Sequence, residues 1–255
     1  MIFKNITDIK AAVEAYREAH PAPAVPAGEQ RITAALCDMD GTLYDSMSRH
    51  SAAWFRLMTE LGVECERDEF YLYEGMTGAN TIRHLFKRAF DTVPTDEEVA
   101  ELYHRKTQYF CELPKPDVMP GAQELIRFCV SHGVRPVLVT GSGQNTLINR
   151  LDADYDRAFS PDLRVTSHIV KRGKPDPEPY LMALKMAGVD ASRAFVVENA
   201  PLGVESGARA GVFTIAVATG PIPRETLDEA GASIVFSSMP ECAKFFPELL
   251  ECLNN

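Results

Sequence analysis

Hydrophobic residues follow two spacings along the chain. Short runs that are apolar throughout end in polar residues and read as buried strands: 32–40, 134–140, 194–199, 212–219 and 232–236. Segments with apolar residues at helical spacing lie between and after them: 120–133, 142–151, 177–188, 201–211 and the C-terminal residues. Fully apolar strands alternating with helices predict an α/β fold with a doubly wound, mostly parallel, Rossmann-like sheet.

A long helical block interrupts this alternation after the first strand. Residues 46–113 have helical spacing almost throughout, and Pro114, Pro116 and Pro120 end the block. We therefore expect an all-helical cap domain at 46–116, inserted into an α/β core made of 31–45 and 117–255. Residues 1–30 are expected to form an extension, a helix over 2–20 followed by a proline-rich tether. In the core, the helix over 142–151 is expected to have Ser142 as its N-cap.

Composition narrows the class of partner. The 255 residues include 26 Lys and Arg against 36 Asp and Glu, a net charge of −10. This charge disfavours nucleic acid and anionic membranes as partners, and no apolar run reaches the ~20 residues that span a bilayer. The six cysteines form no CxxC pair and the start is unlike a secretory signal, so a cytoplasmic protein with reduced thiols is expected, acting as a monomer.

Polar residues gather where the predicted strands end. Because the carboxyl ends of parallel strands meet at one edge of the sheet, we expect these residues to converge on one site. The first, second and fourth groups follow strands and the third precedes a helix: Asp38, Asp40 and Thr42; Thr140, Gly141 and Ser142; Lys174; Glu198 and Asn199.

This combination fits phosphoryl transfer. A carboxylate such as Asp38 can form an aspartyl-phosphate, while a lysine, backbone amides and a metal balance the charge. Mg²⁺ prefers oxygen ligands, which Asp38, the Asp40 carbonyl and Glu198 with Asn199 can supply. The carboxyl of Asp40 can act first as acid and then as base.

The same motifs resemble the haloacid dehalogenase (HAD) superfamily. DMDGT matches its first motif, Thr140 the second, Lys174 the third and Glu198-Asn199 the fourth, and the helical insertion is similar to the cap of the β-phosphoglucomutase-like branch. The resemblance implies that Asp38 is the nucleophile and a metal ligand and that Asp40 is the general acid/base. It also implies that Thr140 and Lys174 hold the phosphoryl group.

The cap segment EGMTGANTI, residues 74–82, bears on the substrate. Related β-phosphoglucomutases carry a lysine at its start and a phosphate-binding arginine four residues later, where this chain has Glu74 and Gly78. Losing an arginine and gaining a carboxylate disfavours a mutase. Glu74 could instead complete the metal site, where Asn199 stands in place of the more usual aspartate.

Further cap and loop residues are candidates for substrate contact. By the same resemblance, His50 and Lys106 link the cap to the core near the acid/base. Gly141, Ser142 and Gln144 belong to the TGSGQ loop, which could contact a leaving phosphate.

Three functions stay open at this point. The motif text is most similar to inorganic pyrophosphatases of this superfamily, so a Mg²⁺-dependent pyrophosphatase is the leading hypothesis. The first alternative is a phosphatase, or less favourably a β-phosphoglucomutase, acting on small sugar phosphates. The second is a phosphate-binding regulator without turnover, which the intact set of Asp38, Asp40, Thr140 and Lys174 disfavours.

Overall fold

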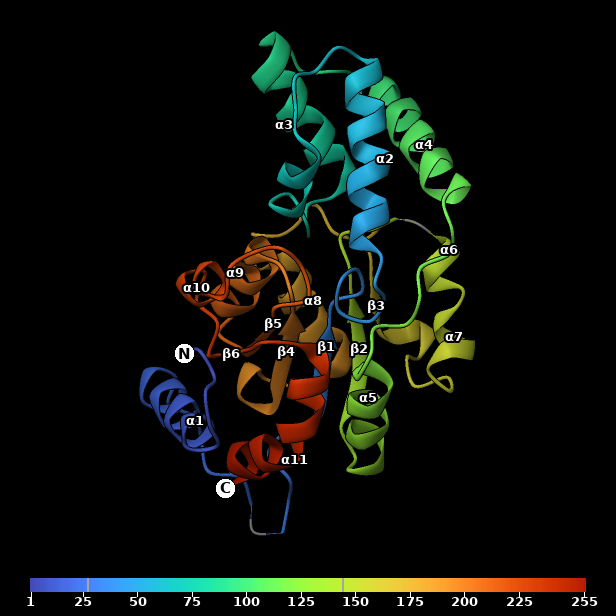
Figure 1. Ribbon diagram of the computed structural model, residues 1–255. Coiled ribbons are helices and arrows are strands. Elements are labelled where there is room, and N and C mark those ends of the chain that lie inside the picture. The colour runs from blue at the N-terminus through green and yellow to red at the C-terminus, as the bar shows by residue number, and fades with distance from the viewer. Residues whose placement is uncertain (27, 144) are drawn as a thin grey trace.

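The core of the molecule is a parallel sheet between two layers of helices. The structure is a computed structural model that describes residues 1–26, 28–143 and 145–255 (Figure 1). The sheet has six strands in the order β3-β2-β1-β4-β5-β6, all neighbours being parallel. The strands are β1 (Ala34–Cys37), β2 (Arg135–Val139), β3 (Arg164–Val165), β4 (Ala194–Glu198), β5 (Phe213–Val217) and β6 (Ile234–Phe236).

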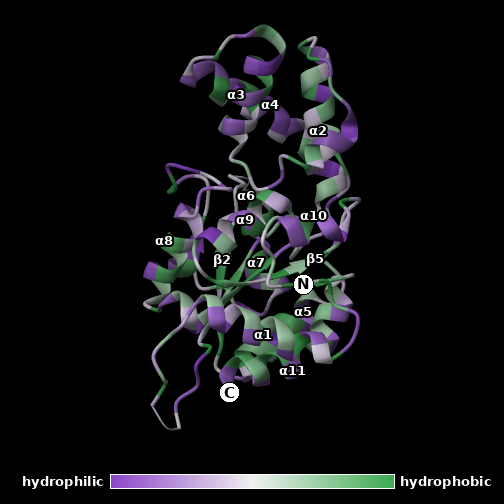
Figure 2. Ribbon diagram, turned by 90° about the vertical axis from the view of Figure 1, so that its left-hand side faces the viewer, coloured by the Kyte–Doolittle hydropathy of each residue, from purple (hydrophilic) through white to green (hydrophobic). Residues whose placement is uncertain are grey.

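Helices cover both faces of this sheet, which confirms the predicted α/β class. One face packs against α1 (Thr7–Ala19), α5 (Ala122–Ser131) and α11 (Met239–Asn254), and the other against α8 (Glu178–Ala187) and α9 (Pro201–Arg209). Ala35 and Cys37 face the first layer, whereas Ala34 and Leu36 face the second. Strands buried on both faces have no polar side to present, which explains the apolar runs and the hydrophobic centre in Figure 2.

The segment after β2 departs from the expected single helix at 142–151. It forms two short helices, α6 (Asn145–Ile148) and α7 (Leu151–Asp154), so the helix does not begin at Ser142. Arg150, between them, donates a hydrogen bond to the carbonyl oxygen of Pro116 at 2.8 Å. This contact joins residues far apart in the chain, so no local sequence pattern predicts it. The other short elements are η2 (Pro161–Leu163), η3 (Ala191–Arg193) and α10 (Arg224–Glu229).

A helical unit stands over the carboxyl ends of the strands (Figure 1). It contains α2 (Met47–Glu60), η1 (Arg67–Tyr71), α3 (Gly78–Phe90) and α4 (Asp96–Glu112). These helices enclose a hydrophobic cluster of their own: Trp54, Leu57, Met58, Val63, Phe70, Ile82, Leu85, Val99 and Leu102. We call this unit the cap; its predicted limits, 46–116, stay a prediction.

The N-terminal segment is tied to the core at two places. The Phe3 amide donates to the Val235 carbonyl at 2.9 Å, so the first residues extend the sheet beyond β6. Ile9 and Val13 of α1 are buried in the main core cluster. The helix expected over 2–20 begins later, at Thr7, because the first residues pair with β6. Within the described residues, every helix is too short or too polar to cross a membrane.

Candidate active site

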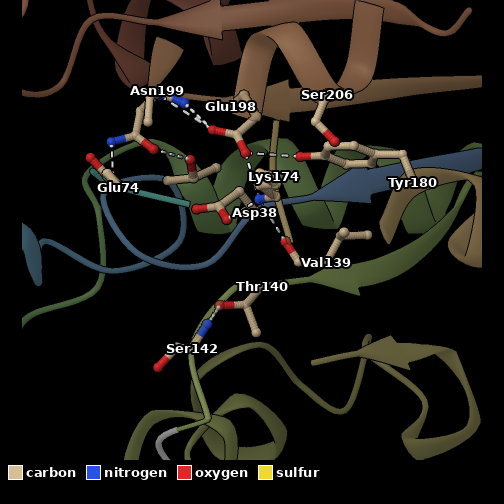
Figure 3. Close-up of polar contacts among 12 residues, drawn as sticks. Asp38, Glu74, Val139, Thr140, Ser142, Lys174, Tyr180, Glu198, Asn199 and Ser206 are labelled. Carbon is tan, nitrogen blue, oxygen red and sulfur yellow. Dashed lines mark hydrogen bonds and ion pairs between the residues drawn. The ribbon is translucent and has the colours of Figure 1, made fainter. Parts of the chain in front are cut away.

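The centre of the site is an ion pair between Asp38 and Lys174. Asp38 follows the last residue of β1, and Lys174 lies in the loop before α8. Lys174 Nζ donates to Asp38 Oδ1 at 2.6 Å and to the Val139 carbonyl at 3.1 Å, as Figure 3 shows. The lysine is 1% exposed. The two side chains, both buried, therefore meet at the predicted edge of the sheet.

Glu198, at the end of β4, holds the same lysine from the other side. Its Oε1 accepts from Lys174 Nζ at 2.6 Å and from the Tyr180 hydroxyl at 2.9 Å. Its Oε2 accepts the backbone amides of Asn199 and Ala200 at 2.9 and 3.2 Å. Both oxygens are thus engaged by protein donors, so this geometry favours Glu198 as a counter-ion of Lys174 over a direct metal ligand.

The charges at this centre are unbalanced. Burial opposes the charge of Lys174, but the carboxylates of Asp38 and Glu198 outweigh it and raise the pKa of the lysine. Burial raises the pKa of Asp38 well above its usual range, and although Lys174 opposes this shift, Glu198 and Asp40 add to it. One lysine does not compensate so many neighbouring carboxylates.

Asp40 belongs to a chain of buried polar groups that reaches into the cap. Its Oδ1 accepts from Ser46 Oγ at 2.6 Å and lies 2.9 Å from His50 Nε2, while Lys106 Nζ lies 2.5 Å from His50 Nδ1. Burial opposes ionisation of Asp40, but His50 and Ser46 outweigh it, so its pKa is lowered. Burial also lowers the pKa of Lys106 to about 7. The sequence expectation that His50 and Lys106 lie near the acid/base thus matches their positions.

The loop after β2 forms another wall. Thr140 Oγ1 accepts the Ser142 backbone amide at 3.0 Å, which shapes the loop around the strand end. Gln144 lies outside the described residues. A cavity of about 60 Å³ lies next to this loop. Candidates from the first two predicted groups and from the cap line it: Asp38, Asp40, His50, Glu74, Lys106, Thr140, Gly141 and Ser142.

Glu74 reaches this cavity from the cap. Its Oε1 accepts from Asn199 Nδ2 at 2.9 Å, and Asn199 Oδ1 accepts from Thr42 Oγ1 at 3.1 Å. Gly41 makes room for this contact, since a Cβ there would lie 2.1 Å from Asn199 Nδ2. Burial raises the pKa of Glu74 well above its usual range, with the charge of Asp38 adding to the effect.

The donor set fits a divalent cation. Asp38 Oδ2 is buried with no hydrogen-bond partner, although the other oxygen of the same carboxylate has one. Two buried lysines face four buried carboxyl groups at the site: Asp38, Asp40, Glu74 and Glu198. The described residues contain no preformed cluster of three His, Cys, Asp or Glu ligands. Mg²⁺ does not need one, because it is commonly held by one or two carboxylates with other oxygens and water.

Sequence reasoning missed three residues at the site. Ser46 and Tyr180 bind the carboxyl groups of Asp40 and Glu198, and the Tyr103 hydroxyl accepts the Gly143 amide at 3.1 Å. Tyr180 lies on the buried face of α8, where an aromatic residue reads as core. Only the hydroxyl groups of these residues distinguish them from packing residues, and a sequence does not show where a hydroxyl points.

A buried carboxylate–lysine pair at the strand ends of a parallel sheet, closed over by a helical cap, defines an α/β enzyme of the phosphoryl-transfer type. The residues from 32 to 211 match the family described as haloacid dehalogenase-like hydrolase. The match spans well over half of the chain, which therefore belongs to this family. The predicted HAD-superfamily phosphohydrolase is confirmed.

Individual relatives agree with the family. The chain is 31% identical over 186 residues to validoxylamine A 7'-phosphate phosphatase of Streptomyces hygroscopicus subsp. limoneus, covering 72% of this chain and 85% of that protein. It is 30% identical to hexitol phosphatase A of Escherichia coli, covering 71% and 81%. A solved structure described as a putative β-phosphoglucomutase from Bacteroides vulgatus is 41% identical, with a TM-score of 0.91 over 98% of this chain and 100% of that one.

Proposed function

We propose that this chain is a Mg²⁺-dependent phosphatase of small phosphorylated compounds that works through an aspartyl-phosphate at Asp38. The observation that carries the proposal is the 2.6 Å contact of Lys174 Nζ with Asp38 Oδ1 at the end of β1. The lysine fixes the carboxylate and offers positive charge next to the phosphorus. This is what attack on an anionic phosphate ester requires.

The reaction has two displacements. The Asp38 carboxylate attacks phosphorus, the bond from phosphorus to the leaving oxygen breaks, and Asp40 gives that oxygen a proton. Asp40 then takes a proton from water, whose oxygen attacks the aspartyl-phosphate and releases phosphate with a free Asp38 carboxylate. The lowered pKa of Asp40 suits the second step, in which a base is needed. Thr140 lines the cavity and would bind phosphoryl oxygens.

A bound Mg²⁺ would neutralise charge on the transferring phosphoryl group. Asp38 Oδ2, the Asp40 carbonyl oxygen and the side chain of Asn199 would hold it, with Glu74 as a further ligand from the cap. The unpartnered Oδ2 of Asp38 and the raised pKa of Glu74 support this assignment. HAD phosphatases generally use this metal, which agrees with the donor set.

The relatives favour a phosphorylated sugar or sugar alcohol over pyrophosphate as the substrate. Their names include hexitol phosphatase A and, for a Thermotoga maritima protein 29% identical over 185 residues, phosphorylated carbohydrates phosphatase. We therefore prefer the sugar-phosphate alternative to the pyrophosphatase that the motifs led us to expect. A mutase is disfavoured because Glu74 and Gly78 offer no cation for a second phosphate.

A substrate panel tests this proposal. Phosphate release is measured with Mg²⁺ from sugar phosphates, sugar-alcohol phosphates, an aryl phosphate and pyrophosphate at equal concentration. We expect the carbohydrate phosphates to have the highest kcat/KM, by tenfold or more over pyrophosphate, and EDTA to abolish release. A tenfold preference for pyrophosphate would overturn the substrate assignment. No release from any compound, with tight phosphate binding, would favour the non-catalytic regulator.

Pyrophosphate remains a second candidate because of the position of Glu74. This buried carboxyl group accepts a hydrogen bond from Asn199, and its negative charge would repel an anion that binds without a metal. Pyrophosphate chelated to Mg²⁺ would instead bring a cation that Glu74 can bind. If so, Glu74→Ala should lower kcat/KM for pyrophosphate at least tenfold more than for the aryl phosphate. Glu69→Ala, on η1 of the cap, serves as a control. Equal losses on both compounds would remove this role from Glu74.

A further inference from the structure

Tyr103 connects the cap directly to the loop that follows β2. It lies on α4, and its hydroxyl oxygen accepts the backbone amide of Gly143 at 3.1 Å. Its ring lies 6.2 Å from that of Trp54, and both rings line the cavity that contains Asp38. The side chain therefore crosses from the cap to the core at the wall of this cavity.

Gly78 gives this ring its place. A Cβ on Gly78 would lie 2.0 Å from Tyr103 Cε2, closer than any real side chain could approach. Glycine is the only residue whose backbone admits the ring there, although it is a poor residue for the first turn of a helix such as α3. The Tyr103 ring thus fills the volume that a side chain at position 78 would otherwise occupy.

The cap contacts narrow what remains of the cavity. A Cβ on Gly141 would lie 2.4 Å from the carbonyl oxygen of Gly75, so the cap loop rests on the phosphate-side loop. The cavity volume is about 60 Å³. Sites for larger organic ligands measure roughly 300–1,000 Å³. In this closed arrangement there is space for a phosphoryl group and a short leaving group.

We propose that Gly78 and Tyr103 together set the size of the substrate. The ring, admitted by Gly78 and held by the Gly143 amide, narrows the cavity and selects the smallest of the proposed carbohydrate phosphates, those with a short leaving group such as a three-carbon polyol. The inference rests on the proposed phosphatase function and names the size class of its substrate. Tyr103 is in this role a specificity-determining residue and takes no part in the chemical steps.

The test compares Tyr103→Ala with Tyr103→Phe on glycerol 3-phosphate and glucose 6-phosphate. We expect Tyr103→Ala to raise the ratio of kcat/KM for the hexose phosphate to that for the glycerol phosphate tenfold or more. Tyr103→Phe keeps the ring, so the ratio should change less than threefold, while KM rises for both compounds. Tyr109→Ala is the control on the same helix. The wild-type Tyr109 hydroxyl donates to Glu60, so its loss should leave the ratio unchanged.

A second variant protects the test against misfolding. Gly78→Ala must displace the ring and should shift the ratio in the same direction as Tyr103→Ala; circular dichroism checks that each variant is folded. An unchanged ratio in folded Tyr103→Ala overturns the inference. The proposed function fails only if the wild type releases phosphate from no compound of the wider panel; if it hydrolyses neither of these two compounds, the size preference is read as the ratio of their dissociation constants by calorimetry. Equal ratios in wild type and Tyr103→Ala would again overturn it.

Discussion

Replacing Asp38 with asparagine is expected to lower kcat by about 10⁴-fold or more, the size of loss seen when an enzyme loses its nucleophile. The amide has the shape of the carboxyl group but cannot attack phosphorus. The fold should survive, because burial, Glu198 and Asp40 already disfavour the charge of Asp38. Removing that charge relieves repulsion at the site while Lys174 keeps Glu198 as its partner.

Phosphate release over time measures this loss, and mass spectrometry of acid-quenched protein detects the covalent phosphate on the wild type. Asp45→Asn is the control, since it makes the same change of charge on an exposed residue seven positions along. It should retain wild-type kcat. An Asp38→Asn variant within tenfold of the wild type, or one that still carries covalent phosphate, would show that another group attacks the substrate.

The part of the site that the sequence predicts is the part that strands position. Asp38 and Glu198 lie at the ends of β1 and β4, which pair in register from Ala34 with Ala194 to Cys37 with Val197. An apolar run identifies a buried strand, and a parallel sheet then dictates that its end lies beside those of its neighbours. Such reasoning needs no knowledge of side-chain contacts. Lys174 does not lie at a strand end, and it is predicted from its sequence motif before a helix.

Other features depend on approaches that no local pattern encodes. The two-residue strand β3 is too short to show a periodicity, and the break between α6 and α7 goes with an Arg150–Pro116 contact across the fold. Tyr103 reads as a residue of the cap core because it follows Leu102 and lies one helical turn after Val99, both members of the cap cluster. The Tyr103 hydroxyl reaches Gly143 only because of how the cap is placed on the core, and that placement is a property of the tertiary structure. The substrate is for the same reason harder to predict than the reaction.

The stability of the site depends on Lys174, and Lys174→Met is expected to lower the free energy of unfolding by about 3–5 kcal/mol at neutral pH. Methionine fills the space but leaves Asp38 and Glu198 buried without their cation, and breaking one side of a buried ion pair costs an amount of this order. The kcat of the variant should fall as well, because Asp38 loses the ammonium group that holds its carboxylate in place. Lys185→Met, an exposed lysine on α8, is the control and should change stability by less than about 0.5 kcal/mol.

The dependence on pH separates this explanation from a simple packing defect. In the wild type the pKa of Lys174 is raised, so its stabilisation is complete at neutral pH and is lost only as the pH rises through that raised value. In the variant, burial without the lysine raises the pKa of Asp38 further, so the folded state binds a proton more tightly than the unfolded chain. The stability deficit should therefore shrink as the pH falls from 8 to 5, measured by urea unfolding at each pH. A deficit that is the same at both values would mean that lost packing, and not the uncompensated carboxylates, accounts for it.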